Sequence, residues 1–243
     1  MLVKTRGIFL NYVKYSDSSI IAHIYTEAFG QQSYIVSGIH GKRSKTKINL
    51  FQSLFLLDLE VWHKPNNLGL QRLKNAHLAA PLSSLPFDIQ KSSQALFIAE
   101  LLNKVLREEE PSNILFDFLF SSVMIFDTLE GSVSNFLIVF LFKLTRYLGI
   151  LPKEKENEKE LFFDLMLATF VRKEPVHPHY LSVEDSLRFA NLFQSDYARM
   201  YSLGFTNHHR RTIFNALILY YKIHLEMETE FKSLTIMREI MQG

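Results

Sequence analysis

The strongest chemical signal in the sequence is a basic stretch flanked by glycines near residue 40. It reads Gly38-Ile39-His40-Gly41-Lys42-Arg43-Ser44-Lys45-Thr46-Lys47, with four positive charges in six positions and no acidic residue. Glycines let a backbone approach a phosphate chain closely, and lysine and arginine side chains displace its counterions. The stretch therefore predicts a loop that binds a polyanion, and a merely solubilising loop is the alternative. It lacks the GxxxxGK[ST] spacing of a nucleoside triphosphate site.

Further cations and aromatic rings fall on the strands expected around this loop. Lys4, Arg6 and Lys14 lie on or at the ends of the first strand and could extend the same positive surface. The rings that could stack on unpaired bases are those of Tyr12, Tyr25, Tyr34 and Trp62. Aromatic residues in strands more often belong to the core, so each ring keeps both interpretations.

A second basic cluster, His208-His209-Arg210-Arg211, follows Thr206, which can cap a helix. Cations in a first helical turn oppose the helix dipole, by about 0.3–1 kcal/mol each when exposed. Their presence makes sense where an anion docks on the free N–H groups of that turn. The alternative is that Arg210 and Arg211 pair with acidic side chains such as Glu184-Asp185.

Residues for catalysis or metal binding are not grouped in a recognisable way. The chain has no cysteine, which excludes disulfides and thiolate zinc sites, and His177 and His179 form only a short pair. No HExxH motif, GxSxG motif or acid pair beside a glycine turn is present. We therefore expect no metal, no cofactor and no catalytic residue, and we interpret His224 as a half-buried helix residue.

Charge is unevenly distributed along the chain. Residues 1–80 hold 10 of the 27 lysines and arginines but 4 of the 25 acidic residues, a net charge of +6, which leaves −4 for the remainder. A basic module joined to a mildly acidic one is expected where one part faces phosphates. The apolar stretch Phe136–Phe142 is far shorter than the ~20 residues needed to span a bilayer, and no signal peptide is visible. We expect a soluble, cytoplasmic protein without membrane contact.

The elements that must position these residues begin with strands. Short apolar or alternating runs predict them at about 5–13, 19–25, 33–39, 50–62 and 68–79. In the fourth run, every second residue from Phe55 to Val61 is apolar, so one face is expected to pack in the core and the other to face solvent. Five strands in about 80 residues match a small closed barrel of the oligonucleotide-binding (OB) fold, in which closure removes exposed edges.

From about residue 81 the apolar period becomes that of helices. Spacing and capping signals predict helices at about 88–107, 112–129, 134–149, 182–194, 207–226 and 233–241. Residues 153–160 form a mixed charge run, interpreted as an exposed loop or frayed helix, and 162–180 is interpreted as irregular. The predicted fold class is α+β, with a five-stranded OB-fold domain at 1–80 and a mainly helical domain at 81–243.

Several segments, taken in order, resemble the family of the recombination mediator protein RecO. In the N-terminal part these are Thr5–Leu10, Tyr15–Ile21, Tyr25–Gly30 and Val36–His40 with the basic stretch that follows. In the C-terminal part they are Leu144–Pro152, which contains a leucine-glycine turn and a proline, and Tyr220–Leu225 with Lys232–Leu234. Each motif is modest, but their order and spacing cover nearly the whole chain.

The resemblance implies an OB-fold domain and a helical domain without enzymatic turnover. Members of this family bind single- and double-stranded DNA and anneal complementary strands. They contact the tail of single-strand DNA-binding protein and, with RecR, help load the RecA recombinase onto coated DNA. Carried over by position, the DNA surface would comprise Lys4, Arg6, Lys42, Arg43, Lys45 and Lys47. The acidic partner tail would be received by the helix that carries Phe140, Lys143 and Arg146.

One departure from the family concerns zinc. Many members carry four cysteines that bind zinc in the segment matching about 153–180, and this chain has none there. We therefore expect no zinc, and we expect packing to hold this segment instead.

The predicted function is that of a cytoplasmic DNA-binding recombination mediator in DNA repair, with Lys14, Arg210 and Arg211 as further DNA contacts. The alternative is a protein-interaction adaptor whose helical domain binds an acidic partner tail without direct DNA binding. A nuclease would need a carboxylate cluster, and none stands out in the sequence.

Overall fold

The computed structural model describes residues 1–39, 46–64, 69–106, 111–131, 133–228 and 230–240, without the side chains of 238–240. By packing, the chain divides into two compact units, Met1–Leu129 and Glu130–Gly243. Each unit buries apolar side chains of its own.

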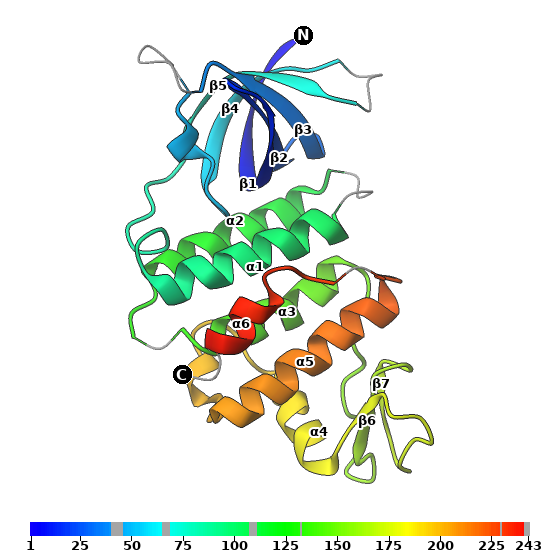
Figure 1. Cartoon of the computed structure of the whole chain (residues 1–243). Coiled ribbons are helices and arrows are strands. Elements are labelled where there is room, and N and C mark those ends of the chain that lie inside the picture. The colour runs from blue at the N-terminus through cyan, green and yellow to red at the C-terminus, as the bar shows by residue number, and fades with distance from the viewer. Residues whose placement is uncertain (40–45, 65–68, 107–110, 132, 229, 241–243) are drawn as a thin grey trace. The chain divides into compact units, whose positions relative to one another are not determined.

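Five strands of the first unit close into a barrel (Figure 1). They are β1 (Leu2–Ser16), β2 (Ser19–Thr26), β3 (Gly30–Ser37), β4 (Leu56–Trp62) and β5 (Gln71–Leu78). Their order is β1-β2-β3-β5-β4, and β4 pairs back with β1. Only the short β3–β5 pairing is parallel in this barrel, and the other four are antiparallel. The predicted OB fold and the α+β class are confirmed.

Side-chain alternation explains why the barrel has a single core. Along β4, Leu57, Leu59 and Val61 are buried, whereas Asp58 and Trp62 are exposed, as the sequence pattern predicts. The inward residues of all five strands join in one cluster of buried side chains. Burial of apolar area contributes roughly 25 cal/mol per Å², so this cluster is the main stabilising feature of the barrel.

The strand expected at 50–62 begins later than predicted, at Leu56. Residues Ile48–Leu50 form a 3-10 turn, and Leu54 adopts the left-handed conformation with a φ of 65°. The Leu54 N–H donates to the Phe9 carbonyl at 2.8 Å, and Phe51 is buried in the core cluster of the barrel. The apolar residues before Leu56 therefore belong to a packed turn and not to a strand.

Strand β1 pairs with two different strands along its length. Its residues Leu2–Ile8 pair with β4, and its residues from Gly7 onward pair with β2. At the overlap, a Cβ on Gly7 would lie 2.7 Å from side-chain atoms of both Ile24 and Leu59. Glycine is therefore required where β1 passes closest to the core.

Two helices complete the first unit: α1 (Ile89–Val105) and α2 (Asn113–Thr128). The side chain of Gln31 on β3 donates to the side-chain oxygen of Asn103 at 2.8 Å, which links β3 to α1. The ring of Tyr25 stacks on that of Phe116, with centroids 6.3 Å apart, which links β2 to α2. These contacts cover part of the barrel's outer surface.

A buried polar network fixes the segment before α1 to the end of α2. The backbone N–H groups of Ser83, Ser84 and Leu85 donate to the Asp127 carboxylate at 2.7–2.8 Å. The buried Lys91 ammonium donates to two carbonyls at the end of α2, at 2.9 and 2.6 Å, and so caps the helix. Burial opposes ionisation of Asp127, but the N–H donors outweigh it and hold the pKa below its ordinary value.

The second unit contains four helices and a small sheet among its described residues. The helices are α3 (Phe136–Tyr147), α4 (Val183–Ala190), α5 (Asn207–His224) and α6 (Leu234–Ile240), close to the predicted ranges. The hydroxyls of Tyr220 and Tyr221 on α5 donate to the carbonyls of Ile150 and Leu141, at 2.6 and 2.8 Å. These bonds join α5 to α3 and to the chain that follows it.

The prediction that residues 162–180 are irregular is wrong. They form a three-stranded antiparallel sheet of order β7-β6-β8, with β6 (Phe162–Asp164), β7 (Thr169–Val171) and β8 (Tyr180–Leu181). The ring of Phe163 packs against Phe170 and Phe189, at centroid distances of 4.9 and 4.3 Å. The buried Asp164 carboxylate lies 3.2 Å from Nε2 of His177. Aromatic packing and hydrogen bonds hold this segment together.

The expected domain boundary near residue 80 stays a prediction. Strands do give way to helices there, but α1 and α2 belong by packing to the same unit as the barrel.

We expect Asp127→Asn to lower the free energy of unfolding at pH 7 by about 1–3 kcal/mol, because an amide oxygen is a weaker acceptor for three buried N–H groups. The folded pKa lies below the unfolded value of about 3.9, so the stabilisation is complete above that value and is lost as the pH falls through the folded pKa. Urea unfolding at pH 7 and pH 3 should show a smaller difference between wild type and variant at pH 3. A difference that does not change with pH, or an equal loss in the exposed Asp17→Asn, contradicts this account.

Candidate functional site

The described ends of the basic loop are fixed to the barrel. Gly38 and Ile39 donate backbone N–H bonds to the Ser18 carbonyl, at 2.8 and 3.3 Å, in the turn between β1 and β2. At the other end Thr46 is buried, and Lys47 is exposed directly before the 3-10 turn. Lys42, Arg43 and Lys45 lie outside the described residues. The loop therefore leaves the barrel beside the β1–β2 turn and rejoins it before β4.

The structure brings Lys14 to the same turn. Lys14 is the register partner of Ile20, and Ser16 pairs with Ser19 directly beside the loop anchor. The Lys14 ammonium lies 3.3 Å from Asp17, but both side chains are largely exposed. Such a surface pair contributes roughly 0–1 kcal/mol, so Lys14 can turn to another anion at little cost.

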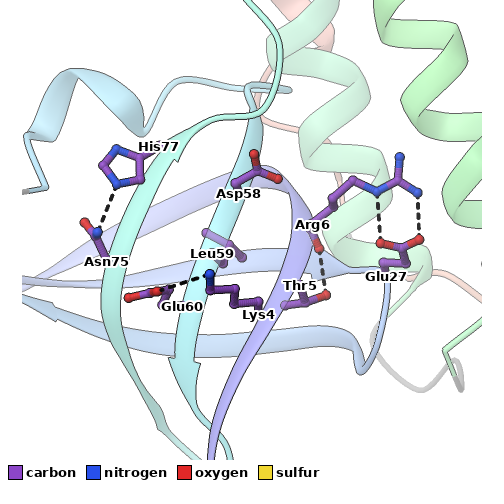
Figure 2. A pocket seen from close by; sticks show the side chains of 9 residues that line it. All are labelled: Lys4, Thr5, Arg6, Glu27, Asp58, Leu59, Glu60, Asn75 and His77. Carbon is purple, nitrogen blue, oxygen red and sulfur yellow. Dashed lines mark hydrogen bonds and ion pairs between the residues drawn. The ribbon is translucent and has the colours of Figure 1, made fainter.

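A hollow of about 600 Å³ lies on the outer face of β1, β4 and β5 (Figure 2). Its lining residues are Lys4, Thr5, Arg6, Glu27, Asp58, Leu59, Glu60, Asn75 and His77. Two cations there face three carboxylates, so the lining carries a net negative charge with neutral histidine. The positive surface that the sequence suggested around Lys4 and Arg6 is therefore interrupted by acidic groups.

Arg6 is engaged inside its own unit. Its Nε and Nη2 donate to the Glu27 carboxylate at 2.9 and 2.6 Å, the paired contacts drawn in Figure 2. Its guanidinium also lies 5.1 and 5.0 Å from the ring centroids of Phe116 and Phe120 on α2. The hydrogen bond with Glu27 raises the pKa of Arg6 and lowers that of Glu27. Arg6 therefore ties β1 to the β2–β3 turn and to α2. The expectation that it also contacts DNA stays a prediction.

Lys4 is more accessible than Arg6. Its side chain is 85 % exposed, and its ammonium reaches Glu60 only at 4.0 Å. The same Glu60 carboxylate lies 3.3 Å from the ammonium of Lys74. One carboxylate between two lysines leaves a positive charge at this point of the barrel.

Sequence reasoning missed two cations on β5, Arg72 and Lys74. Both flank the buried Leu73, so the alternation along residues 71–78 was the signal that could have identified them. Arg72 is exposed and forms no ion pair with any other described residue.

The four candidate stacking rings divide into two pairs. Tyr25 and Tyr34 are fully buried, so the interpretation of these two as base-stacking groups is wrong. Tyr12 and Trp62 are 45 % and 46 % exposed. Tyr12 lies in the second half of β1, whereas Trp62 on β4 pairs with Leu2 at the start of β1. Only these two of the four can reach a ligand.

The candidate partner-binding helix α3 presents two cations at its surface, whereas Phe140 is buried. Phe140 is 2 % exposed and stacks on Phe136 with ring centroids 6.1 Å apart. Its ring is a core residue, which corrects the expectation that Phe140 contacts a partner. Lys143 is partly exposed and Arg146 is exposed, one turn apart on α3.

At the basic start of α5, Arg210 forms a hydrogen bond to the chain directly before the helix. Thr206 caps the helix as predicted, and the Arg210 guanidinium donates to a backbone carbonyl of the preceding turn at 2.6 Å. The acids Glu184-Asp185, suggested as partners, pair with Arg188 instead. Arg211 is exposed and is the better remaining anion contact of the two.

Metal binding, membrane spanning and the role of His224 can also be checked in the described part of the chain. It contains no group of three or more histidine and acidic side chains placed to hold a metal ion. Its helices are all too short or too polar to cross a bilayer. His224 bonds through Nε2 to the Leu165 carbonyl at 2.8 Å, which confirms it as a satisfied, half-buried helix residue.

Comparisons with known proteins match the whole chain. Residues 1–82 match the family described as Recombination protein O N terminal, and residues 86–235 match Recombination protein O C terminal. The chain is similar to the DNA repair protein RecO of Bacteroides fragilis, with 36% identity, and of Azobacteroides pseudotrichonymphae, with 34% identity. It is 30% identical to that of Flavobacterium psychrophilum. Each comparison covers 99% of both chains.

We expect Arg6→Ala to lower the free energy of unfolding by about 1–3 kcal/mol, because it removes charged hydrogen bonds and ring contacts. Lys4→Ala, on the same strand, should change it by less than about 0.5 kcal/mol. Urea unfolding of both variants measures the difference. Equal stability of the two variants would show that the Arg6 contacts are not structural.

Proposed function

We propose, since the chain belongs to the RecO family of DNA repair proteins, that it binds DNA through its N-terminal barrel and acts as a recombination mediator. In this role it anneals complementary strands and helps load a recombinase onto coated single-stranded DNA. Its proposed partners are single- and double-stranded DNA, RecR and the tail of single-strand DNA-binding protein. We propose that it does so in the cytoplasm and without catalytic turnover.

The observation that carries DNA binding is the way the barrel's charges are paired. Glu27 and Asp58 lie beside Arg6, and Asp17 lies beside Lys14. Glu60, the last of the four carboxylates in residues 1–80, lies between Lys4 and Lys74. Among the described residues, no acid of the first 80 forms an ion pair with Lys47, Lys64 or Arg72. These cations supply the net positive charge that favours a polyanion.

The proposed DNA surface therefore centres on the basic loop and the β1–β2 turn. It comprises Lys14, Lys42, Arg43, Lys45 and Lys47, with Lys4 at its edge. Lysine and arginine there would neutralise phosphates and release counterions without reading sequence. Arg211, on α5 in the second unit, is a separate and weaker candidate for DNA contact.

A second candidate function is supported by α3. Lys143 and Arg146 lie at the surface one turn apart, and the helix contains no acidic residue over its twelve positions. This is the charge that an acidic partner tail needs. The chain would then act as an adaptor through its helical part, with or without direct DNA binding.

We expect affinity for single-stranded DNA to fall about 50-fold between 50 and 200 mM salt, a slope of roughly −3, if the loop neutralises about four phosphates. Changing Lys42, Arg43, Lys45 and Lys47 together to alanine should abolish most of this dependence. Fluorescence anisotropy with a labelled oligonucleotide measures both slopes.

The matched control for the loop variant removes four exposed cations elsewhere, at Lys153, Lys159, Arg172 and Lys173. It changes the net charge equally but should keep the wild-type slope. An unchanged slope in the loop variant, or an equal loss in the control, rules out the loop as the DNA site.

We expect an acidic peptide ending in phenylalanine to bind the full chain in the absence of DNA. Lys143→Ala with Arg146→Ala should weaken this binding about tenfold, because two charge contacts are lost. Anisotropy of a labelled peptide measures it, and Arg188→Ala on α4 is the control. Peptide binding that both variants retain equally would place the tail elsewhere.

A further inference from the structure

The outer face of the barrel carries a row of side chains separate from the basic loop. Strand register places Ile21 on β2 beside Ile35 on β3, and Ile35 beside Arg72 on β5. Arg72 in turn lies beside Trp62 on β4. Neighbouring strands are about 5 Å apart, so these four residues, the outer row, form an unbroken line across four strands. Figure 1 shows those strands as neighbours in the barrel wall.

The outer row faces solvent. Tyr34 and Val61 each come directly before a row residue and are fully buried, so alternation turns the row outward. Almost half of the Trp62 side chain is exposed, Arg72 is exposed, and the two isoleucines are partly exposed. A ligand on this face would therefore contact a large aromatic ring, a guanidinium and two aliphatic side chains together.

The charges around the outer row favour an anionic occupant. Lys4 and Lys74 share one carboxylate, that of Glu60, close to the β4 end of the row. Lys64 is exposed and follows the row by two positions along the chain. With Arg72 these make four cations against one carboxylate. A polyanion with apolar flat groups matches this surface, and a single-stranded nucleic acid has both properties.

We propose that the outer row is a stacking platform for unpaired bases, and that it makes the protein prefer single-stranded nucleic acid to duplex. The proposal rests on the DNA binding proposed above and assigns its strand selectivity to Trp62 and Arg72. Indole and guanidinium planes stack on bases of any sequence, whereas in a duplex the base faces are covered by neighbouring pairs. The basic loop would contact phosphates, which both forms carry, so we assign the discrimination between them to the outer row.

The test uses the fact that Trp62 is the only tryptophan of the chain. The full chain is titrated with a thymine oligonucleotide of ~20 nucleotides, with an abasic oligonucleotide of equal length and charge, and with a duplex. Stacking contributes ~1–3 kcal/mol per base, so we expect the thymine strand to bind about tenfold more tightly than the abasic strand. Trp62 fluorescence should be quenched by the thymine strand and not by the other two.

Variants separate stacking from charge. Trp62→Ala should abolish the tenfold preference for thymine over abasic strands, measured by anisotropy, while affinity for the abasic strand stays within about twofold. Trp62→Phe should retain most of the preference because it keeps a ring. Phe87→Ala removes a ring that is 82 % exposed outside the barrel strands and should leave all affinities unchanged.

The outcomes distinguish this proposal from the function on which it rests. If Trp62→Ala keeps the wild-type ratio and a native circular dichroism spectrum, the stacking platform is wrong. If the variant has lost its native spectrum, the ratio measured with Arg72→Ala decides instead, and an unchanged ratio again overturns the platform. If the wild-type chain binds none of the three ligands, DNA binding itself fails.

Discussion

The four carboxylates among the first 80 residues lie beside cations of β1 and β5, and this pairing decides which charges the barrel can present. Glu27 engages Arg6 with two hydrogen bonds, and Glu60 is shared by Lys4 and Lys74. Acidic groups therefore neutralise the strand wall around the hollow, while the loop sequence contains none. For the DNA binding proposed above, counterion release would therefore come from the loop more than from the strands around the hollow.

Most of the fold could be predicted because alternation and helical period leave direct marks in the sequence. Six helices, and the five barrel strands apart from the start of β4, appear close to their expected positions, because most of them show an apolar period in the sequence. The sheet of β6, β7 and β8 was missed because strands of two or three residues are too short to show a period. The start of β4 was misplaced because a packed 3-10 turn is as apolar as a strand. Both errors come from local composition that several structures share.

The candidate site was less predictable, because it depends on contacts between residues far apart in the chain. Nothing near Arg6 in the sequence shows that its guanidinium bonds to Glu27, 21 positions later, and lies over rings of α2. Likewise, Tyr25 and Tyr12 have similar strand contexts, and only the helix packed on Tyr25 makes it a core residue. Residue type and spacing identified the possible cations and rings. Three-dimensional packing then determined which of them a ligand can reach.

Because β1 pairs with both β2 and β4, the order in which the chain is synthesised decides when each half of β1 can pair. The first half of this strand pairs with residues 56–62, so it has no partner until those residues have been synthesised. The ring closes only with β5, which ends at Leu78 and joins β3 through two register pairs. Such distant pairing is slow, because the entropy of a long closed loop is lost before the contacts form. On the ribosome, the first half of β1 must therefore wait with an unpaired edge until β4 has emerged.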